Sequence, residues 1–222
     1  MTEPVKPDEP KQPENAGAAD EPEVDWAAYY RHTLGREARP LFARGVEAMV
    51  AADVPSGQAV EIGFGDGTET LLLLGAGFTV LAIEATRDAE AVLRPRVPRR
   101  EARRLDIRIA PAETVELPPF DLLYSGYVFS FLDPDAFRRF WTGVRAHLRP
   151  GGFLVFNIFG VHDTWAIEPD MTFLDLDGVH RLVDGLDVIE IREEDQDGDS
   201  FSGPKHWHIF DVIARRPMGG DG

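Results

Sequence analysis

A glycine-rich turn constrains this 222-residue chain more than any other segment. It reads Gly63-Phe64-Gly65-Asp66-Gly67 and lies between a short apolar run, Ala59–Ile62, and a predicted helix, Thr68–Leu74. Because glycine has no Cβ, the backbone of such a strand–turn–helix unit can approach a ligand closely. The spacing is G-x-G-x-G, whereas dinucleotide sites usually have G-x-G-x-x-G. Glu61, just before the first glycine, adds a negative charge that would repel a pyrophosphate and attract a cationic end of a ligand.

Two further acids follow the next two predicted strands. Glu84 lies 21 residues after Gly63, at the carboxyl end of the strand Phe78–Ile83. A carboxylate in that place can accept both hydroxyl protons of a ribose. Ala112 and Glu113 follow the third strand, Leu105–Ile109, where a carboxylate can accept from an adenine amino group. For each acid the alternative is an ordinary solvated charge in a loop.

Strands alternate with helices along the chain, which predicts a parallel sheet covered by helices on both faces. Helices are predicted at 25–34, 87–93 and 176–183. A further helix begins at Pro40, with Phe42, Val46, Met49 and Val50 on one face, and another is capped by Asp133-Pro134. Further strands are predicted at 120–124, 153–159, 187–191 and 206–214, with a turn at 149–152 and an acidic loop at 193–199. Residues 105–109 alternate apolar and polar side chains, as in a half-exposed edge strand. We divide the chain into a disordered acidic, proline-rich tail (1–24), one domain (25–217) and a flexible C-terminus (218–222).

Composition excludes several classes of protein. The net charge of −16 would repel nucleic acid, and proteins that bind nucleic acid need a basic surface. The chain has no cysteine, so disulfides, thiolate metal sites and cysteine nucleophiles are excluded. No apolar run approaches the ~20 residues that span a bilayer, and the N-terminus does not have the pattern of a secretory signal. We therefore expect a cytoplasmic protein with neither a nucleic-acid nor a membrane partner.

The ordered set of motifs resembles the class I S-adenosylmethionine (SAM)-dependent methyltransferases. It consists of Glu61, the glycine turn, Glu84, Ala112-Glu113 and the segment Leu148–Leu154, and it spans about residues 60–159. The flanks, 26–30 and 205–217, resemble bacterial small-molecule members related to the tellurite-resistance and thiopurine-type methyltransferases. The resemblance implies a Rossmann-like, doubly wound α/β fold with seven strands in the order 3-2-1-4-5-7-6 and strand 7 antiparallel.

The resemblance also implies that SAM is the cofactor. The implied cofactor-binding residues are Glu61, Gly63, Phe64, Gly65, Gly67, Glu84, Ala85, Ala112, Glu113, Ser125, Gly126 and Tyr127. Family members often have an acid where this chain has Pro111, so the adenine contact depends more on Glu113 and the backbone of Ala112.

In the implied fold, the antiparallel last strand begins at the edge of the sheet that holds the cofactor. We therefore expect the methyl acceptor near the start of that strand, with His208, His206, Asp163 and His162 as candidate general bases. The candidate acceptor-binding residues are Trp26, Tyr29, Tyr30, Arg31, Trp165 and Trp207. The two histidines of the strand can equally be packing residues. No metal is expected, because the spacing of His206, His208 and Asp163 does not require one.

The predicted function is transfer of a methyl group from SAM to an oxygen, nitrogen, sulfur or selenium atom of a small molecule. Methylation of adenine or of glutamine amides is disfavoured, because Tyr124-Ser125-Gly126-Tyr127 is not an Asn/Asp-Pro-Pro-aromatic turn. Two alternatives remain at this stage. One is a SAM-binding regulatory protein without turnover, and the other is a nicotinamide-dependent oxidoreductase, which the glycine spacing and Glu61 oppose.

Removal of residues 1–23 should leave the melting temperature and the affinity for SAM nearly unchanged, because that segment is too polar to pack against a core. Thermal denaturation and calorimetric titration of the shortened chain test this expectation. A deletion extended through Tyr30 serves as the comparison, since it removes the first aromatic cluster and should weaken SAM binding. A large fall in melting temperature on the shorter deletion would contradict the expectation.

Overall fold

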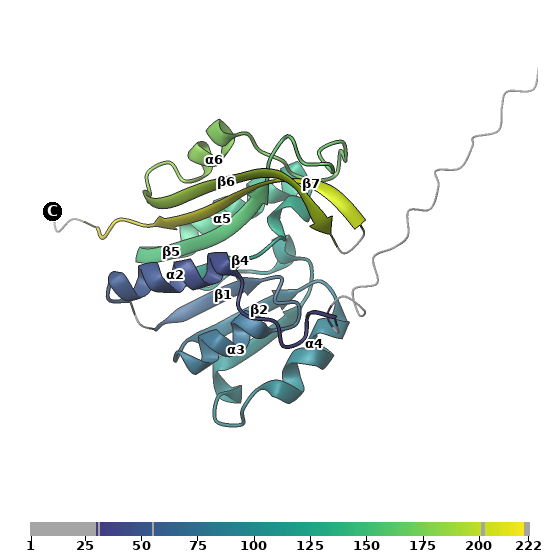
Figure 1. Cartoon of the computed structure of the whole chain (residues 1–222). Coiled ribbons are helices and arrows are strands. Elements are labelled where there is room, and N and C mark those ends of the chain that lie inside the picture. Colours follow the sequence, from purple (N-terminus) through teal and green to yellow (C-terminus); the bar gives the residue numbers. More distant parts are fainter. Residues whose placement is uncertain (1–29, 31, 55, 201–202, 220–222) are drawn as a thin grey trace, which may run out of the picture.

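A seven-stranded sheet forms the centre of the computed structural model, which describes residues 30, 32–54, 56–200 and 203–219. The strand order is β3-β2-β1-β4-β5-β7-β6 (Figure 1). Strands β1 to β5 pair in parallel, and β7 is antiparallel to both β5 and β6. The strands are β1 (Gln58–Ile62), β2 (Thr79–Glu84), β3 (Leu105–Ile109), β4 (Phe120–Ser125), β5 (Leu148–Phe159), β6 (Asp187–Ser200) and β7 (Gly203–Arg215). The predicted order and the antiparallel β7 are confirmed.

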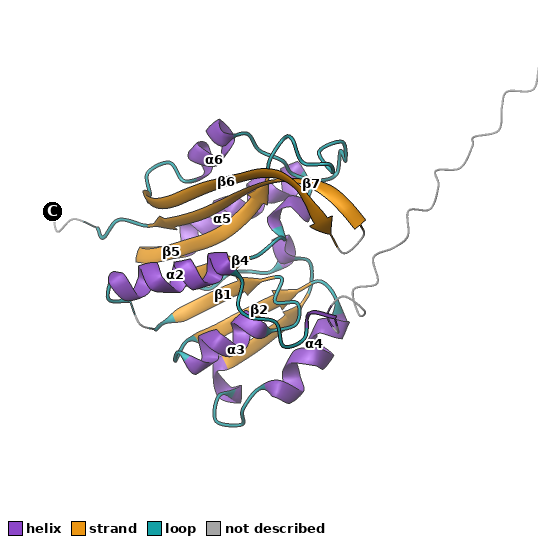
Figure 2. Cartoon of the chain, viewed as in Figure 1, coloured by secondary structure: helices purple, strands orange, loops and turns teal. Residues whose placement is uncertain are grey.

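Helices cover both faces of this sheet (Figure 2). They are α2 (Pro40–Ala51), α3 (Thr68–Gly75), α4 (Arg87–Leu93), α5 (Pro134–His147) and α6 (Leu176–Leu182). The core has two parts, one on each face. Residues of α2, α3 and α4 pack in one, and residues of α5 and α6 pack in the other. None of the described helices is both long enough and apolar enough to cross a membrane.

The helix α5 shows how local sequence positions these layers. Asp133 caps its start, because the carboxylate accepts hydrogen bonds of 3.0 Å from the backbone N–H groups of Asp135 and Ala136. Its buried face consists of Phe137, Phe140, Trp141 and Val144, as the helical spacing predicts. On α2 the prediction is partly wrong. Phe42 and Met49 are buried, but Val50 is 68% exposed because it lies one residue beyond the buried face.

Two segments predicted as connections belong to strands. Residues 149–152 are part of β5, where a shift of register places Phe120 opposite Leu148 and Leu122 opposite Phe153. The extra residues form an irregularity in the strand, so the predicted turn is wrong. Residues 193–199, predicted as a loop, continue β6 and pair with β7. Their side chains are exposed and therefore lack the apolar alternation that would have indicated a strand.

Some predictions fall outside the described residues. The tail 1–24 and most of the predicted helix 25–34, including Trp26, Tyr29 and Arg31, lie there. Residues 220–222 of the predicted flexible C-terminus lie there as well.

Candidate cofactor and acceptor site

A cavity of about 1140 Å³ lies at the carboxyl ends of the central parallel strands. One end is lined by the glycine turn after β1, by Glu84 to Thr86 after β2 and by residues 110–113 after β3. The other end is lined by Tyr127 and Phe131 after β4, by residues of the segment 165–171 and by side chains of β6 and β7. This edge is where ligands bind in open α/β sheets, since the loops after parallel strands meet there.

The glycine turn has a conformation that few other residues adopt. Gly63, Gly65 and Gly67 have φ values of +73°, +51° and +77°. A Cβ at Gly63 would overlap Val128, and one at Gly67 would lie 2.6 Å from Leu93 Cδ1. At Gly65 the nearest atom is Tyr30 Cε1, 3.6 Å away, so backbone conformation alone disfavours a side chain there. Gly63, Phe64 and Gly65 line the cavity, whereas Gly67 does not.

The carboxylate of Glu84 connects the glycine turn to the end of β2. Its Oε2 accepts from the backbone N–H of Gly65 at 3.2 Å, and its Oε1 accepts from that of Ala85 at 2.8 Å. Oε1 also interacts with the N–H and the hydroxyl of Thr86, at 3.3 and 3.2 Å. The hydroxyl of Tyr30 lies 2.7 Å from Thr86 Oγ1. Glu84 therefore joins two segments of the cavity wall, the glycine turn and residues 85–86, and its Oε2 still has acceptor capacity for a ligand.

Four buried polar atoms near the glycine turn lack a hydrogen-bond partner among the described residues: Arg36 Nε, Glu61 Oε1, Tyr124 Oη and Ser125 Oγ. Buried polar groups are normally paired, so each such atom calls for an explanation. Tyr124 and Arg36 line the cavity; Glu61 and Ser125 lie behind its wall. Burial and the neighbouring Glu69 raise the pKa of Glu61 well above its ordinary value, even though Thr70 Oγ1 donates to Glu61 Oε2 at 2.5 Å. A cationic ligand group near this end would stabilise the charged form of Glu61.

Arg36 is a site residue that sequence reasoning missed. Its guanidinium donates to both carboxylate oxygens of Glu69, at 2.7 and 2.5 Å, and to Asp66 Oδ1 at 3.1 Å. Burial of Glu69 alone would raise the pKa of its carboxyl, but the hydrogen bonds from Arg36 and from the Arg39 amide outweigh it and lower that pKa. Arg36 follows no recognisable motif, since it reaches the site from a loop before α2. Only the charged cluster Asp66 and Glu69 after β1 could have suggested that a cation lies opposite.

The adenine-end predictions lie where expected along the chain. Ala112 and Glu113 form a short 3₁₀ turn after β3, with Ala112 buried and Glu113 exposed. Both line the cavity, as do Ala85 and Pro111.

Aromatic rings form the walls of the other end of the cavity. The Tyr127 ring packs edge-on against Trp207, with centroids 6.1 Å apart, and Trp165 packs against both Trp207 and Phe159 at 6.0 and 5.8 Å. Tyr127 has a φ of +62°, which is strained for a residue other than glycine, and its N–H donates to Asn157 Oδ1 at 2.6 Å. Gly126 and Tyr127 line the cavity, as do the predicted acceptor-binding residues Trp165 and Trp207. The third, Tyr30, also lines the cavity but lies at the glycine-turn end, beside Gly65 and Thr86.

An ion pair lies behind these rings. Lys205 and Asp163 form a salt bridge in which both side chains are buried, and Lys205 Nζ lies 4.0 and 4.1 Å from the ring centroids of Trp165 and Trp207. Asp163 also accepts from the backbone N–H groups of Trp165 at 3.0 Å and of His208 at 3.3 Å. Neither charged residue lines the cavity. Their contacts attach the loop that carries Trp165 to β7.

The three predicted histidines lie away from the cavity, because side chains alternate along β7. Trp207 and Ile209 face the cavity, whereas His206 and His208 are on the other side of the strand. The His162 ring stacks on the His208 ring and so lies on that side as well. His208 Nδ1 accepts from the His162 backbone N–H at 3.0 Å, and its Nε2 lies 2.9 Å from Glu193 Oε1. Since Nδ1 accepts, Nε2 carries the proton and donates to Glu193. The structure thus brings the predicted bases to the acceptor edge but not into the cavity that it describes.

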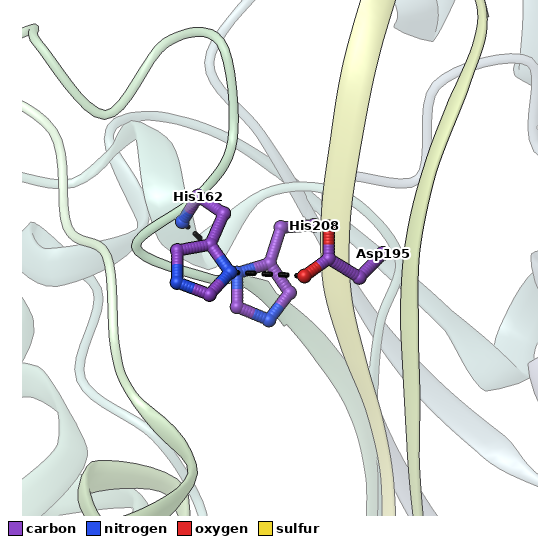
Figure 3. Close-up of side chains that lie close together, drawn as sticks. All are labelled: His162, Asp195 and His208. Atoms are coloured by element: carbon purple, nitrogen blue, oxygen red, sulfur yellow. Dashed lines mark hydrogen bonds and ion pairs between the residues drawn. The ribbon is translucent and has the colours of Figure 1, made fainter.

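Two of these histidines and Asp195 form the group that could hold a metal ion in the described part of the chain. His162, Asp195 and His208 each offer a ligand atom, and these atoms lie within 4.8 Å of one another (Figure 3). Asp195 also joins His162 and His206, with distances of 2.9 Å to His162 Nδ1 and 2.6 Å to His206 Nε2. Hydrogen bonds with Asp197 and Asp195 raise the pKa of His206. Both ring nitrogens of His208 are engaged, so a metal ion would have to displace an existing hydrogen bond.

Comparison with known proteins agrees with this geometry. Residues 60–156 match a family described as a methyltransferase domain. The fold is that of SAM-dependent methyltransferases, and among proteins with curated descriptions none matches the sequence.

Solved structures of methyltransferases superpose on the chain at low sequence identity. TehB from Haemophilus influenzae has a TM-score of 0.67 and 16% identity, over 86% of this chain and 67% of that one. The N-methyltransferase NodS from Bradyrhizobium japonicum, in complex with S-adenosyl-L-homocysteine (SAH), has a TM-score of 0.60 and 16% identity, over 87% and 99%. The glycopeptide N-methyltransferase MtfA, in complex with SAM, has a TM-score of 0.55 and 20% identity, over 79% and 94%.

The substitution Glu61→Gln should stabilise the cofactor-free protein at neutral pH. The raised pKa of Glu61 means that the folded state holds a proton that the unfolded chain releases above about pH 4.3, so stability falls as the pH rises from there toward the folded pKa. Glutamine does not ionise, so the variant does not lose stability in this way as the pH rises. We expect a gain on the order of 1 kcal/mol at pH 7, seen as a melting temperature a few degrees higher, and a smaller gain near pH 4.

Glu69→Gln is the matched control with the opposite sign. The lowered pKa of Glu69 makes its charge stabilising above its unfolded pKa, so this variant should melt lower at pH 7 and approach the parent protein as the pH falls. A difference between Glu61→Gln and the parent that stays constant from pH 4 to 7 would refute the buried, protonated Glu61.

Proposed function

We propose that this protein transfers the methyl group of SAM to a nucleophilic atom of a small molecule. The observation that carries the proposal is the division of one cavity into two ends. One end joins the glycine turn to Glu84 and to the unpaired buried atoms of Arg36 and Tyr124, and the other is walled by aromatic rings. A ligand with a charged amino-acid part, a ribose and a purine fits the first end, and an apolar acceptor fits the second.

The described residues match the parts of SAM by their chemistry. Glu84 Oε2 would accept from the ribose hydroxyls, and Glu113 with the Ala112 backbone would meet the adenine. The guanidinium of Arg36 suits the carboxylate of the methionine part, and the acids around it suit the ammonium group. When bound, SAM supplies a methyl group on a positively charged sulfur atom.

The protein's own contribution is alignment. Fixing donor and acceptor in one cavity replaces a bimolecular encounter. When the reacting atoms are well oriented, this lowers the activation free energy by several kcal/mol. The Lys205–Asp163 pair and the histidine cluster hold Trp165 and Trp207 from behind. This placement favours a packing role for His162, His206, His208 and Asp163 over proton transfer.

The first test is binding of SAH, the demethylated form of SAM, measured by calorimetry on the parent protein and on Glu84→Gln. We expect the variant to bind about 10- to 100-fold more weakly, because it loses the charge on the acceptor of the ribose hydroxyls. Glu116→Gln changes an exposed acid outside the cavity and should bind SAH like the parent protein.

Melting curves show whether Glu84→Gln still folds, because Glu84 also orders the glycine turn. A folded Glu84→Gln variant with unchanged SAH affinity would refute the assigned role of Glu84. Binding of NADH in place of SAH would favour an oxidoreductase. SAH release from SAM in the presence of an acceptor panel separates a transferase from a protein that only binds SAM.

A further inference from the structure

The acceptor end of the cavity combines aromatic walls with exposed acids. The rings of Tyr127, Phe159, Trp165 and Trp207 line it. Four acids line the same end, Glu168, Asp170, Glu194 and Asp199, and all four are exposed to solvent. Glu194 lies on β6 opposite Ile209 of β7, which also lines the cavity.

Positive charge in the described lining is confined to two arginines. Arg36 is held by Asp66 and Glu69 at the glycine-turn end, and Arg39 lies over the Tyr127 ring, with its guanidinium carbon 4.7 Å from the ring centroid. Lys205 is outside the lining, and Asp163 balances its charge. The described lining contains nine acids against these two arginines.

This charge distribution selects among acceptors. A carboxylate or an inorganic oxyanion would meet exposed acids that outnumber the cations of the described lining, where Arg39 already stacks on the Tyr127 ring. A cation on an apolar, planar body would gain from the acids through their field and from the ring faces through cation–π attraction. The apolar body would replace water against the aromatic walls.

Resting on the proposed function, we infer that the acceptor is an organic amine, cationic at neutral pH, on an aromatic or similarly planar apolar body. Its ammonium group lies toward Glu194 and Glu168, and its ring lies against the wall that Trp165, Trp207 and Tyr127 form. The inference concerns recognition of the acceptor and holds for whichever of its atoms receives the methyl group.

Three compounds with one indole body and different charge test the inference. Tryptamine is cationic, tryptophol is neutral and indole-3-acetate is anionic. Their dissociation constants are measured by calorimetry with the protein saturated with SAH, so that the donor end is filled. We expect tryptamine to bind at least about tenfold more tightly than indole-3-acetate, with tryptophol between them.

Variants connect this order to the named residues. The double substitution Glu168→Gln, Glu194→Gln should reduce the ratio of the dissociation constants of indole-3-acetate and tryptamine about threefold or more. The dissociation constant of tryptophol should stay unchanged. Asp197→Asn is the matched control, since Asp197 is also an exposed acid on β6 but contacts His206 outside the cavity. Trp207→Leu should weaken all three compounds together.

The outcomes separate the two proposals. If SAH binds but indole-3-acetate binds as tightly as tryptamine, or none of the three compounds binds, the inference fails and the proposed function stands. If the double variant keeps the full difference between tryptamine and indole-3-acetate, the inference fails as well. If SAH does not bind to the folded protein, both fail together.

Discussion

Parallel pairing of β1 with β2 and with β4 is the constraint on which the rest of the site depends. This pairing brings the turns after three strands to one edge of the sheet, where Glu84 can reach the backbone of Gly65. The positive φ values of the three turn glycines let the chain leave β1 and enter α3 within five residues. Backbone geometry and the Glu84 carboxylate therefore fix the position of the glycine turn in the cavity wall.

At the glycine-turn end, buried charged groups have polar atoms without a hydrogen-bond partner among the described residues. Such groups are common where a bound ligand supplies the missing partner. Glu61 is buried with an unpaired oxygen, and Arg36 has an unpaired Nε although two acids hold its other nitrogens. Removal of these groups from water is unfavourable unless something else compensates. A ligand with both a positive and a negative group would compensate both, and this connects the stability of the empty protein to its affinity for a cofactor.

The aromatic end of the cavity is organised by alternation along β7. Trp207 and Ile209 face the cavity, and His206 and His208 face the opposite side, where β6 and the loop at 162 contribute acids and a third histidine. A Cβ at Gly160 would overlap the His208 ring, so the chain passes very close to this histidine. The two sides of the strand therefore differ: Trp207 and Ile209 on one side contact the cavity, and His206 and His208 on the other contact the acids of β6 and the loop at 162.

The sequence alone determined the fold class, the strand order and the glycine-turn end of the site. The fold class and the glycine-turn end follow from local patterns: apolar runs of strand length, a glycine turn at a fixed distance from Glu84, and the Asp133-Pro134 cap. The strand order was implied by the resemblance that the ordered set of motifs carries. Only the tertiary structure decided the extent of β6, the bulged start of β5, the place of Arg36 and the side of β7 that faces the cavity. The reason is physical. An exposed acidic strand such as 193–199 is defined by its pairing with β7 and not by apolar alternation, and Arg36 reaches Glu69 only across 33 positions of folded chain. The period of two placed His206 and His208 together, but which side they share depends on how β7 packs between β5 and β6.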